Sequence, residues 1–127
     1  MFIHHNPTTV SAPASAYSHG ACAPANSCWL HISGQISLKA DVSLAGDGEA
    51  QMQACWERIF AILTDGDMSK KDIVKVTAYV TDEAPAASYR EIRDRNMEGT
   101  LSASTLLVVS ALAHPDWVVE IEAIAAG

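Results

Sequence analysis

The chain has 127 residues, of which 49% are hydrophobic, so it is long enough to fold as one domain, residues 1–127, around a moderate core. Fifteen acidic residues against eight basic ones give a net charge of −7, which is the wrong sign for holding a phosphate backbone, and we expect no nucleic acid partner. No segment reaches membrane-spanning length, and the amino terminus lacks the basic run and apolar stretch of a signal peptide. These features predict a cytoplasmic protein without membrane contact.

In the first half of the chain, composition and spacing predict an extended segment, a strand and a helix. Residues 11–27 are rich in Ala, Pro, Ser and Asn, which favours an extended edge segment and a loop. Trp29 to Ile36 alternates as a strand does, and Gly34 inside it indicates a bulge or a close approach of the backbone to another group. Asp47 is the predicted N-cap of a helix that ends at Asp65-Gly66. The apolar stripe of this helix comprises Met52, Cys55, Trp56, Ile59, Phe60 and Leu63.

The second half adds a strand, a helix and two further strands. The expected elements are a half-covered strand over 73–80, a helix from Asp82 to about Met97 with Pro85 in its first turn and Gly99 after its end, a buried strand over 106–111, and a last strand over 118–125. On this second helix, Arg90 and Asp94, like Glu91 and Arg95, have the i,i+4 spacing of paired opposite charges. The spacing predicts a solvated helix face that also includes Arg93.

The last predicted strand sets Glu120 and Glu122 on one face of an otherwise apolar segment. A strand that is apolar on both faces is normally covered on both, so the two carboxylates are expected to face a second layer, a subunit interface or a wet pocket. The alternative is that both are exposed near the end of an edge strand, where charge prevents aggregation.

The order strand, strand, helix, strand, helix, strand, strand predicts an α+β fold, a mixed β-sheet with both helices packed on one face. The other face would carry apolar side chains that cannot all stay in contact with water in a small domain, namely Tyr79, Leu106 or Leu107, Val118 and Ile124. We therefore expect an oligomer that buries this face. The three cysteines are odd in number, and neither they nor the scattered histidines show metal-ligand spacing, so we expect reduced thiols and no metal site.

Three segments together resemble the RidA/YjgF family of reactive-intermediate deaminases. They are Ala-Tyr-Ser-His-Gly at 16–20, Ser-Gly-Gln-Ile at 33–36 and Glu-Ile-Glu-Ala-Ile-Ala at 120–125, and the likeness extends over about residues 11–126. The resemblance implies a chorismate-mutase-like (YjgF-like) protomer. It also implies a homotrimer with three clefts between neighbouring subunits, each of which takes a small-molecule substrate.

The resemblance further implies roles for particular residues. In the family, the carboxylate that matches Glu120 holds the water that adds to the C=N carbon, so Glu120 is the expected catalytic residue. The strand backbone at Gly34, next to Ser33, contacts the substrate, and Tyr17 borders the cleft, so these three are expected to bind substrate. The reaction requires no metal and no cofactor. Glu122 is expected to serve structure or the interface.

The chain departs from the family pattern at Ser104. Where deaminase members carry Pro-Ala-Arg-Ser, this chain has Ser-Ala-Ser-Thr at 102–105, so Ser104 replaces the arginine that binds the substrate carboxylate. One neutral hydroxyl binds a carboxylate more weakly than two charge-assisted bonds do, and small 2-iminoacids are expected to bind poorly. Arg90 lies near a family position beside the cleft and is a candidate for supplying the missing charge from another wall, in competition with the solvated-face interpretation.

Three functions remain open at this stage. The first is a RidA-like hydrolase that deaminates a reactive enamine or imine other than the usual small 2-iminoacid. The second is a non-catalytic trimer that binds a small ligand on the same fold, since a fold does not by itself establish a function. The third is an RNA-directed translation inhibitor or endoribonuclease, which the net charge of −7 disfavours.

Overall fold

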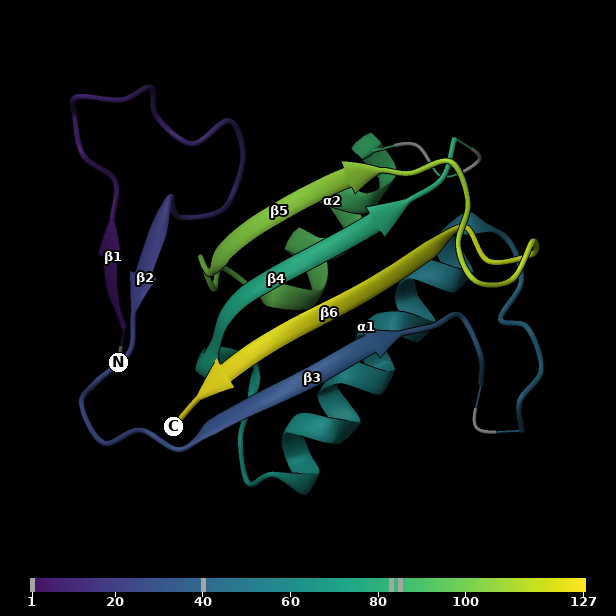
Figure 1. The fold of residues 1–127 in the computed structure, drawn as a ribbon, viewed down its shortest axis with the longest axis horizontal. Helices are drawn as coiled ribbons and strands as arrows, with labels where there is room; N and C mark the ends of the chain where they lie inside the picture. Colours follow the sequence, from purple (N-terminus) through teal and green to yellow (C-terminus); the bar gives the residue numbers. More distant parts are fainter. Residues whose placement is uncertain (1, 40, 83, 85) are drawn as a thin grey trace.

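A computed structural model describes residues 2–39, 41–82, 84 and 86–127, and in it a four-stranded sheet carries α1 (Gly48–Asp65) and α2 (Ala86–Met97) on one face (Figure 1). The strands lie in the order β3 (Trp29–Gln35), β6 (Val119–Ala126), β4 (Ile73–Val80) and β5 (Ala103–Val108). β6 is antiparallel to both of its neighbours, whereas β4 and β5 are parallel. The predicted mixed sheet with two helices on one face is confirmed.

The first helix begins and ends where its local signals predicted. Asp47 Oδ1 accepts a hydrogen bond from the Ala50 amide at 2.9 Å, which satisfies one of the free amides of the first turn. The predicted stripe faces the sheet and is buried except for Phe60, which is partly buried. The helix stops at Asp65, and the Gly66 amide donates to the carbonyls of Ile62 and Leu63.

Two elements of the second half differ from prediction in their bounds. α2 begins at Ala86 rather than Asp82, and Pro85 lies outside the described residues. The predicted stop is correct: the helix ends at Met97, and Gly99 has a left-handed φ of +83°, which glycine adopts without a steric cost. β5 spans Ala103–Val108 instead of 106–111, and it is an edge strand in which Leu107 and Val108 are 45% and 61% exposed rather than buried.

The segment before β3 forms a separate ribbon instead of a strand of the main sheet. β1 (Ile3–His5) and β2 (Gly20–Cys22) pair with each other in antiparallel fashion. Between them, the chain touches β5 through a bridge of Ser18 to Ala103, in which the Ser18 amide donates to the Ser102 carbonyl at 3.1 Å. Of the extended edge segment expected over 11–27, residues 20–22 form β2 outside the main sheet, and the bridge at Ser18 is the contact with its edge strand β5.

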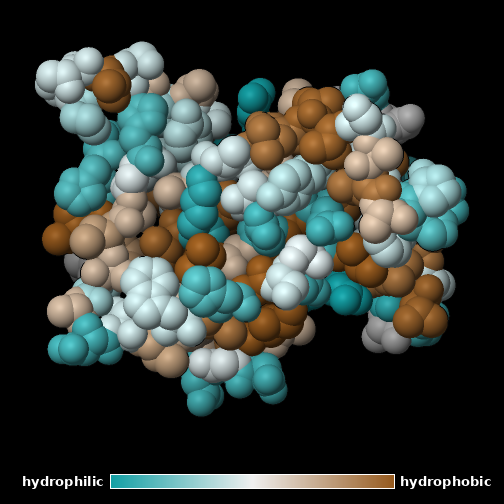
Figure 2. Space-filling model, in the orientation of Figure 1, coloured by the Kyte–Doolittle hydropathy of each residue, from teal (hydrophilic) through white to brown (hydrophobic). Residues whose placement is uncertain are grey.

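The face of the sheet away from the helices, hereafter the open face, keeps its side chains partly exposed. Tyr79, Glu120 and Leu107 lie on it, and pairing of Tyr79 with both Glu120 and Leu107 sets them side by side. Leu106 instead packs against the core, which settles the alternative between the two leucines. Figure 2 views this face, where hydrophilic and hydrophobic residues are intermixed and hydrophobic ones gather near the end of β5.

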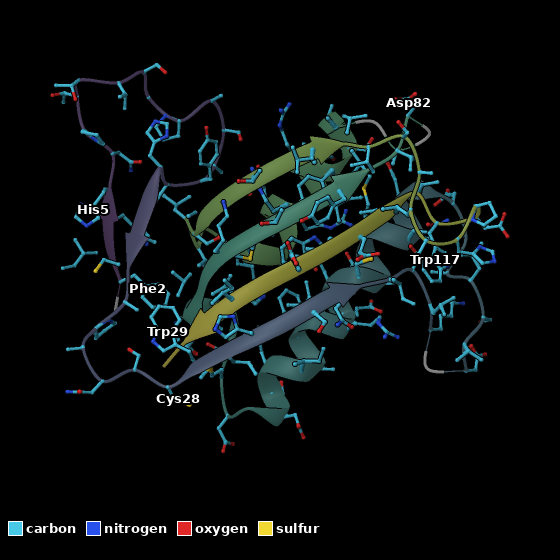
Figure 3. The ribbon with its side chains drawn as sticks, in the orientation of Figure 1. Phe2, His5, Cys28, Trp29, Asp82 and Trp117 are labelled. Carbon is cyan, nitrogen blue, oxygen red and sulfur yellow. The ribbon has the colours of Figure 1, made fainter. Side chains whose placement is uncertain are left out.

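The open face reaches from the β5 edge to the opposite edge strand, β3. Trp29, at the beginning of β3, is 52% exposed and lies with Cys28 beside the carboxyl terminus (Figure 3). There the backbones of Cys28 and Gly127 exchange two hydrogen bonds of 2.8 and 3.0 Å. In the part of the chain that the structure describes, no helix is long and apolar enough to cross a membrane.

β6 lies inside the sheet, between β3 and β4. The alternative that Glu120 and Glu122 sit on an edge strand is therefore wrong. Val119, Ile121 and Ala123 point to the helices and are buried, whereas Glu120 and Glu122 alternate with them on the open face and are half-buried. The strand is flanked on both sides, so its carboxylates are not there to protect an edge.

Candidate active site

Gly34 and Glu120 form the first part of the candidate site. The pairing of β3 with β6 shifts register between Ile32 and Gln35, which is the irregularity that a glycine in this strand predicted. A Cβ built on Gly34 would lie 2.8 Å from Glu120 Cδ and 3.1 Å from its Cγ, and would overlap the carboxylate oxygen beyond them. The group that comes close to the Gly34 backbone is therefore the Glu120 side chain, and a side chain at 34 would displace it.

Glu122, two residues along the same strand, is engaged in a different way. It accepts a hydrogen bond of 2.7 Å from the Tyr79 hydroxyl on the neighbouring strand β4. This bond to a carboxylate, with some desolvation, raises the pKa of the Tyr79 phenol above its ordinary value. Among the described residues, no side chain donates a hydrogen bond to the Glu120 carboxylate. Glu120 is thus the one of the pair left free to hold a water or a ligand.

Ser33 lies at a hollow of about 280 Å³ on the open face, between β3, β6 and β4. Lys75 and Glu122 supply its charges, and Lys75 Nζ also donates to Thr105 Oγ1 at 2.5 Å. The hollow is lined by His31, Ile32, Ser33, Lys75, Thr77, Glu122, Ala123 and Ile124. Ser33, Gly34, Glu120 and Glu122 therefore lie near one another on the open face.

Tyr17, Arg90 and Ser104 meet elsewhere, in a pocket of about 150 Å³ between the N-terminal segment, α2 and β5, hereafter the arginine pocket. Arg93 also lines it, and its remaining lining residues are Ala14, Ser15 and Leu106. Ser104 and Leu106 both lie on the helix side of β5, because Ser104 pairs with the buried Val76 of β4. The structure thus brings together three of the predicted substrate-binding residues.

The N-terminal segment holds Tyr17 at the arginine pocket. Its neighbour Ser18 is 1% exposed, and Ser18 Oγ donates to the Leu101 carbonyl at 2.7 Å, which ties the segment to the start of β5. The Tyr17 hydroxyl accepts a hydrogen bond from the Ala14 amide at 3.4 Å. The Tyr17 ring also stands edge to face with His19, with centroids 5.9 Å apart.

Arg93 was not predicted as a site residue, and the prediction of a solvated helix face is wrong for it. Arg93 is 5% exposed and pairs with its neighbour Asp94, whereas neither of the expected i,i+4 ion pairs of α2 is formed. Arg90 is exposed at the mouth of the pocket, as expected for a solvent-facing position. The available signal was the position of Arg93 one turn after Tyr89, on the side of α2 that is buried in the structure.

The site residues fall into two groups on opposite faces of the sheet. Ser33, Gly34 and Glu120 belong to the open face, and Tyr17, Arg90 and Ser104 to the helix side of the β5 edge. The sheet itself lies between the two groups, so within one protomer they do not line a common pocket. Each group is incomplete for the predicted chemistry, because one offers a carboxylate for water and the other offers cations.

Other ionisable groups are buried in the core and take no part in either group. Burial raises the pKa of Cys55 to about 12, so its thiol stays protonated and unreactive at neutral pH. Burial likewise raises the pKa of the Tyr89 phenol. Within the ranges 2–39, 41–82 and 86–127, no three His, Cys, Asp or Glu side chains are grouped so that they could hold a metal ion together.

Comparison with known proteins places this geometry in a family. A family model described as Endoribonuclease L-PSP matches residues 8–127. A RutC family protein from Pyrococcus horikoshii is 34% identical over 99 residues, which are 76% of this chain and 78% of that protein. YyfB of the conserved Rid protein family, from Yersinia pestis, has a TM-score of 0.87 at 29% identity, covering 99% of this chain and 98% of its own.

TdcF from E. coli, whose structure contains bound serine, has a TM-score of 0.72 at 25% identity and covers 93% of this chain and 91% of its own. Fold, sequence segments and family model all point the same way. The matched residues 8–127 include the N-terminal tyrosine segment, the Ser-Gly-Gln-Ile segment and the Glu120 strand. The chain therefore belongs to the RidA/YjgF family.

Proposed function

We propose that the protein hydrolyses a reactive enamine or imine by adding water to its C=N carbon, in clefts between the subunits of a homotrimer. The Glu120 carboxylate carries this proposal. It lies half-buried against the Gly34 backbone and accepts no hydrogen bond from a described side chain. A carboxylate in that state can orient a water and take its proton as the water attacks.

The space over Gly34 supports the same role. Because residue 34 has no side chain, the Glu120 carboxylate lies directly on the strand backbone, whose amide and carbonyl groups then border the reacting atoms. The backbone polar groups can orient the nitrogen of the substrate while Glu120 holds the water. The reaction needs no electron carrier or group carrier, because water supplies both the oxygen and the protons.

The trimer is proposed from the separation of the two groups of site residues and from the open face. Leu107 and Trp29 are exposed on that face, and a small domain rarely leaves such a surface in water. A neighbouring subunit packed there would bring a second arginine pocket toward Glu120 and join the two groups in one cleft. Clefts of this kind would give each trimer three sites.

The substrate is proposed to differ from the usual small 2-iminoacid. Ser104 stands where the family arginine would bind the carboxylate, and the Ser104 hydroxyl offers one neutral hydrogen bond in its place. The bound serine in TdcF supports a site that accepts a small molecule. A trimer that binds such a molecule without converting it is the alternative proposal, and the experiment below separates the two.

The test is hydrolysis of imines generated in place from a panel of amino acids by an amino-acid oxidase. We expect Glu120→Gln to lower the rate on an accepted imine by about 100-fold or more, because the amide cannot take a proton from water. Glu122→Gln is the matched control, because Glu122 is bound to Tyr79 on the same face, and it should keep most of the rate. If both variants turn over at the wild-type rate with assembly intact, the hydrolase proposal fails and the binding trimer becomes the better account.

A further inference from the structure

We infer that the arginine pocket binds the carboxylate of the substrate and that Arg93 of α2 is its anchor, in place of an arginine on β5. This inference rests on the proposed function, because it assigns a substrate class to the same cleft. It makes the substrate an anionic imine or enamine. It also assigns a binding role to Arg93, which the charge pattern of α2 had placed on a solvated helix face.

The Arg93 guanidinium is buried but not fully used. Arg93 is 5% exposed, and its Nε and Nη2 contact Asp94 Oδ1 at 2.9 and 2.8 Å. Nη2 also donates to Ser15 Oγ at 3.3 Å, and no described residue accepts a hydrogen bond from Nη1. A guanidinium has five N–H donors, so Arg93, which lines the pocket, retains donors that a ligand there could use.

The described lining of the pocket is positively charged although the chain is acidic. Arg90 and Arg93 are the charged side chains among the described lining residues, and none of those residues carries a carboxylate, in a protein of net charge −7. Asp94 offsets part of the Arg93 charge from outside the lining, where it is 44% exposed. Two guanidinium groups against one carboxylate leave a local excess of one positive charge, which favours an anionic occupant.

A buried hydroxyl in the wall also lacks a partner. Ser104 Oγ is shielded from solvent and makes no hydrogen bond to a described residue, although most buried polar atoms in folded proteins are satisfied. Ser104 lines the same pocket as Arg93, so an oxygen bound by Arg93 would be near Ser104 Oγ. One ligand oxyanion would then satisfy the spare arginine donors and the orphaned hydroxyl together.

The pocket size and its partners favour a carboxylate over a larger anion. About 150 Å³ holds a planar group of a few atoms, and the fork of a guanidinium matches the two oxygens of a carboxylate. Arg93 already shares its Nε and Nη2 with Asp94, so its grip is weaker than that of an unpaired arginine. The substrate then needs further contacts beyond its carboxylate, which is consistent with the expectation that the smallest 2-iminoacids bind poorly.

The direct test is binding of propionate, followed by NMR titration at low ionic strength with propionamide and inorganic phosphate as comparisons. Propionate should bind, propionamide should not, and phosphate should bind more weakly. Arg93→Gln should weaken propionate binding by about 10- to 100-fold, the value of a charge-assisted bidentate contact. Arg95→Gln is the control, because it removes the same charge from an exposed position of the same helix outside the pocket.

A second variant keeps the test decisive if Arg93→Gln fails to fold. Ser104→Asp places a carboxylate inside the pocket, where it should pair with Arg93, abolish propionate binding and leave the thermal midpoint within about 3 °C of wild type. Undiminished propionate binding by Ser104→Asp, or phosphate binding tighter than propionate binding in the wild type, would overturn the assignment. Neither measurement uses turnover. Failure of the Arg93 assignment in the binding tests can therefore be distinguished from failure of the hydrolase proposal in the imine assay.

Discussion

On the open face, the Glu120 carboxylate lies over a glycine and accepts no hydrogen bond from a described side chain, whereas at the β5 edge the Arg93 guanidinium is buried and already paired with Asp94. The position of Glu120 next to Gly34 follows from the register in which β3 and β6 pair. Arg93 was placed by a contact between its helix and a segment 78 residues away, at Ser15. The position of Glu120 is thus determined by local strand pattern, whereas the position of Arg93 is determined by packing between distant segments.

Gly34→Ala should produce the largest effect on turnover. The substitution also separates the role of the Glu120 carboxylate in turnover from the stability of the fold. The new methyl group meets the end of the Glu120 side chain, which can swing away at little energetic cost, so the fold should survive while the carboxylate leaves its place. We expect turnover to fall by about 100-fold, as for Glu120→Gln, with the free energy of unfolding lowered by no more than about 1 kcal/mol.

Gly20→Ala is the matched control for that prediction. A methyl group at Gly20 would lie 3.5 Å from His5 Cβ, an ordinary contact in the β1–β2 ribbon, so turnover and stability should both stay near wild type. Steady-state rates and urea unfolding on both variants give the comparison. A Gly34→Ala enzyme with normal turnover would show that the position of Glu120 over the β3 backbone does not matter.

Local signals account for the parts of the structure that the sequence predicted. Asp47 and the apolar stripe define α1 within one continuous segment, and strand alternation places Glu120 and Glu122 on a common face. Gly34 indicated that another group comes close to the β3 backbone, because a glycine inside a strand usually marks a bulge or such a close approach. What the pattern could not tell was whether the approaching group was a ligand or, as found, the protein's own carboxylate.

The parts that were wrong depend on contacts between distant segments. The spacing of Arg90 and Asp94 fits a solvated face, but which side of α2 turns inward is decided by its packing against α1 and residues 14–17. The start of β5 at Ala103 has the same origin, because Ala103, Ser104 and Thr105 form a strand by pairing with β4 rather than by apolar content. Neither the inward side of α2 nor the start of β5 produces a periodic pattern of apolar residues in the sequence.

Tyr79→Phe should have a smaller effect and sharpen the difference between the two carboxylates of β6. It removes the 2.7 Å hydrogen bond to Glu122, so we expect the protein to unfold at a slightly lower urea concentration and turnover to change by no more than about three-fold. Urea unfolding at fixed protein concentration and steady-state rates measure the two quantities. A loss of turnover as large as that of Gly34→Ala would mean that the Tyr79–Glu122 pair takes part in the reaction.

Mixed assembly of two inactive variants tests whether Glu120 of one subunit and the arginine pocket of another make one site. Glu120→Gln and Ser104→Asp protomers, each inactive alone, are unfolded together in equal amounts, refolded and assayed. If the groups come from different subunits, about one quarter of the clefts receive an intact Glu120 and an intact pocket, and activity returns to about that fraction of wild type. If every mixture stays as inactive as its parents while the oligomer forms, the two groups do not meet across subunits and the account is contradicted.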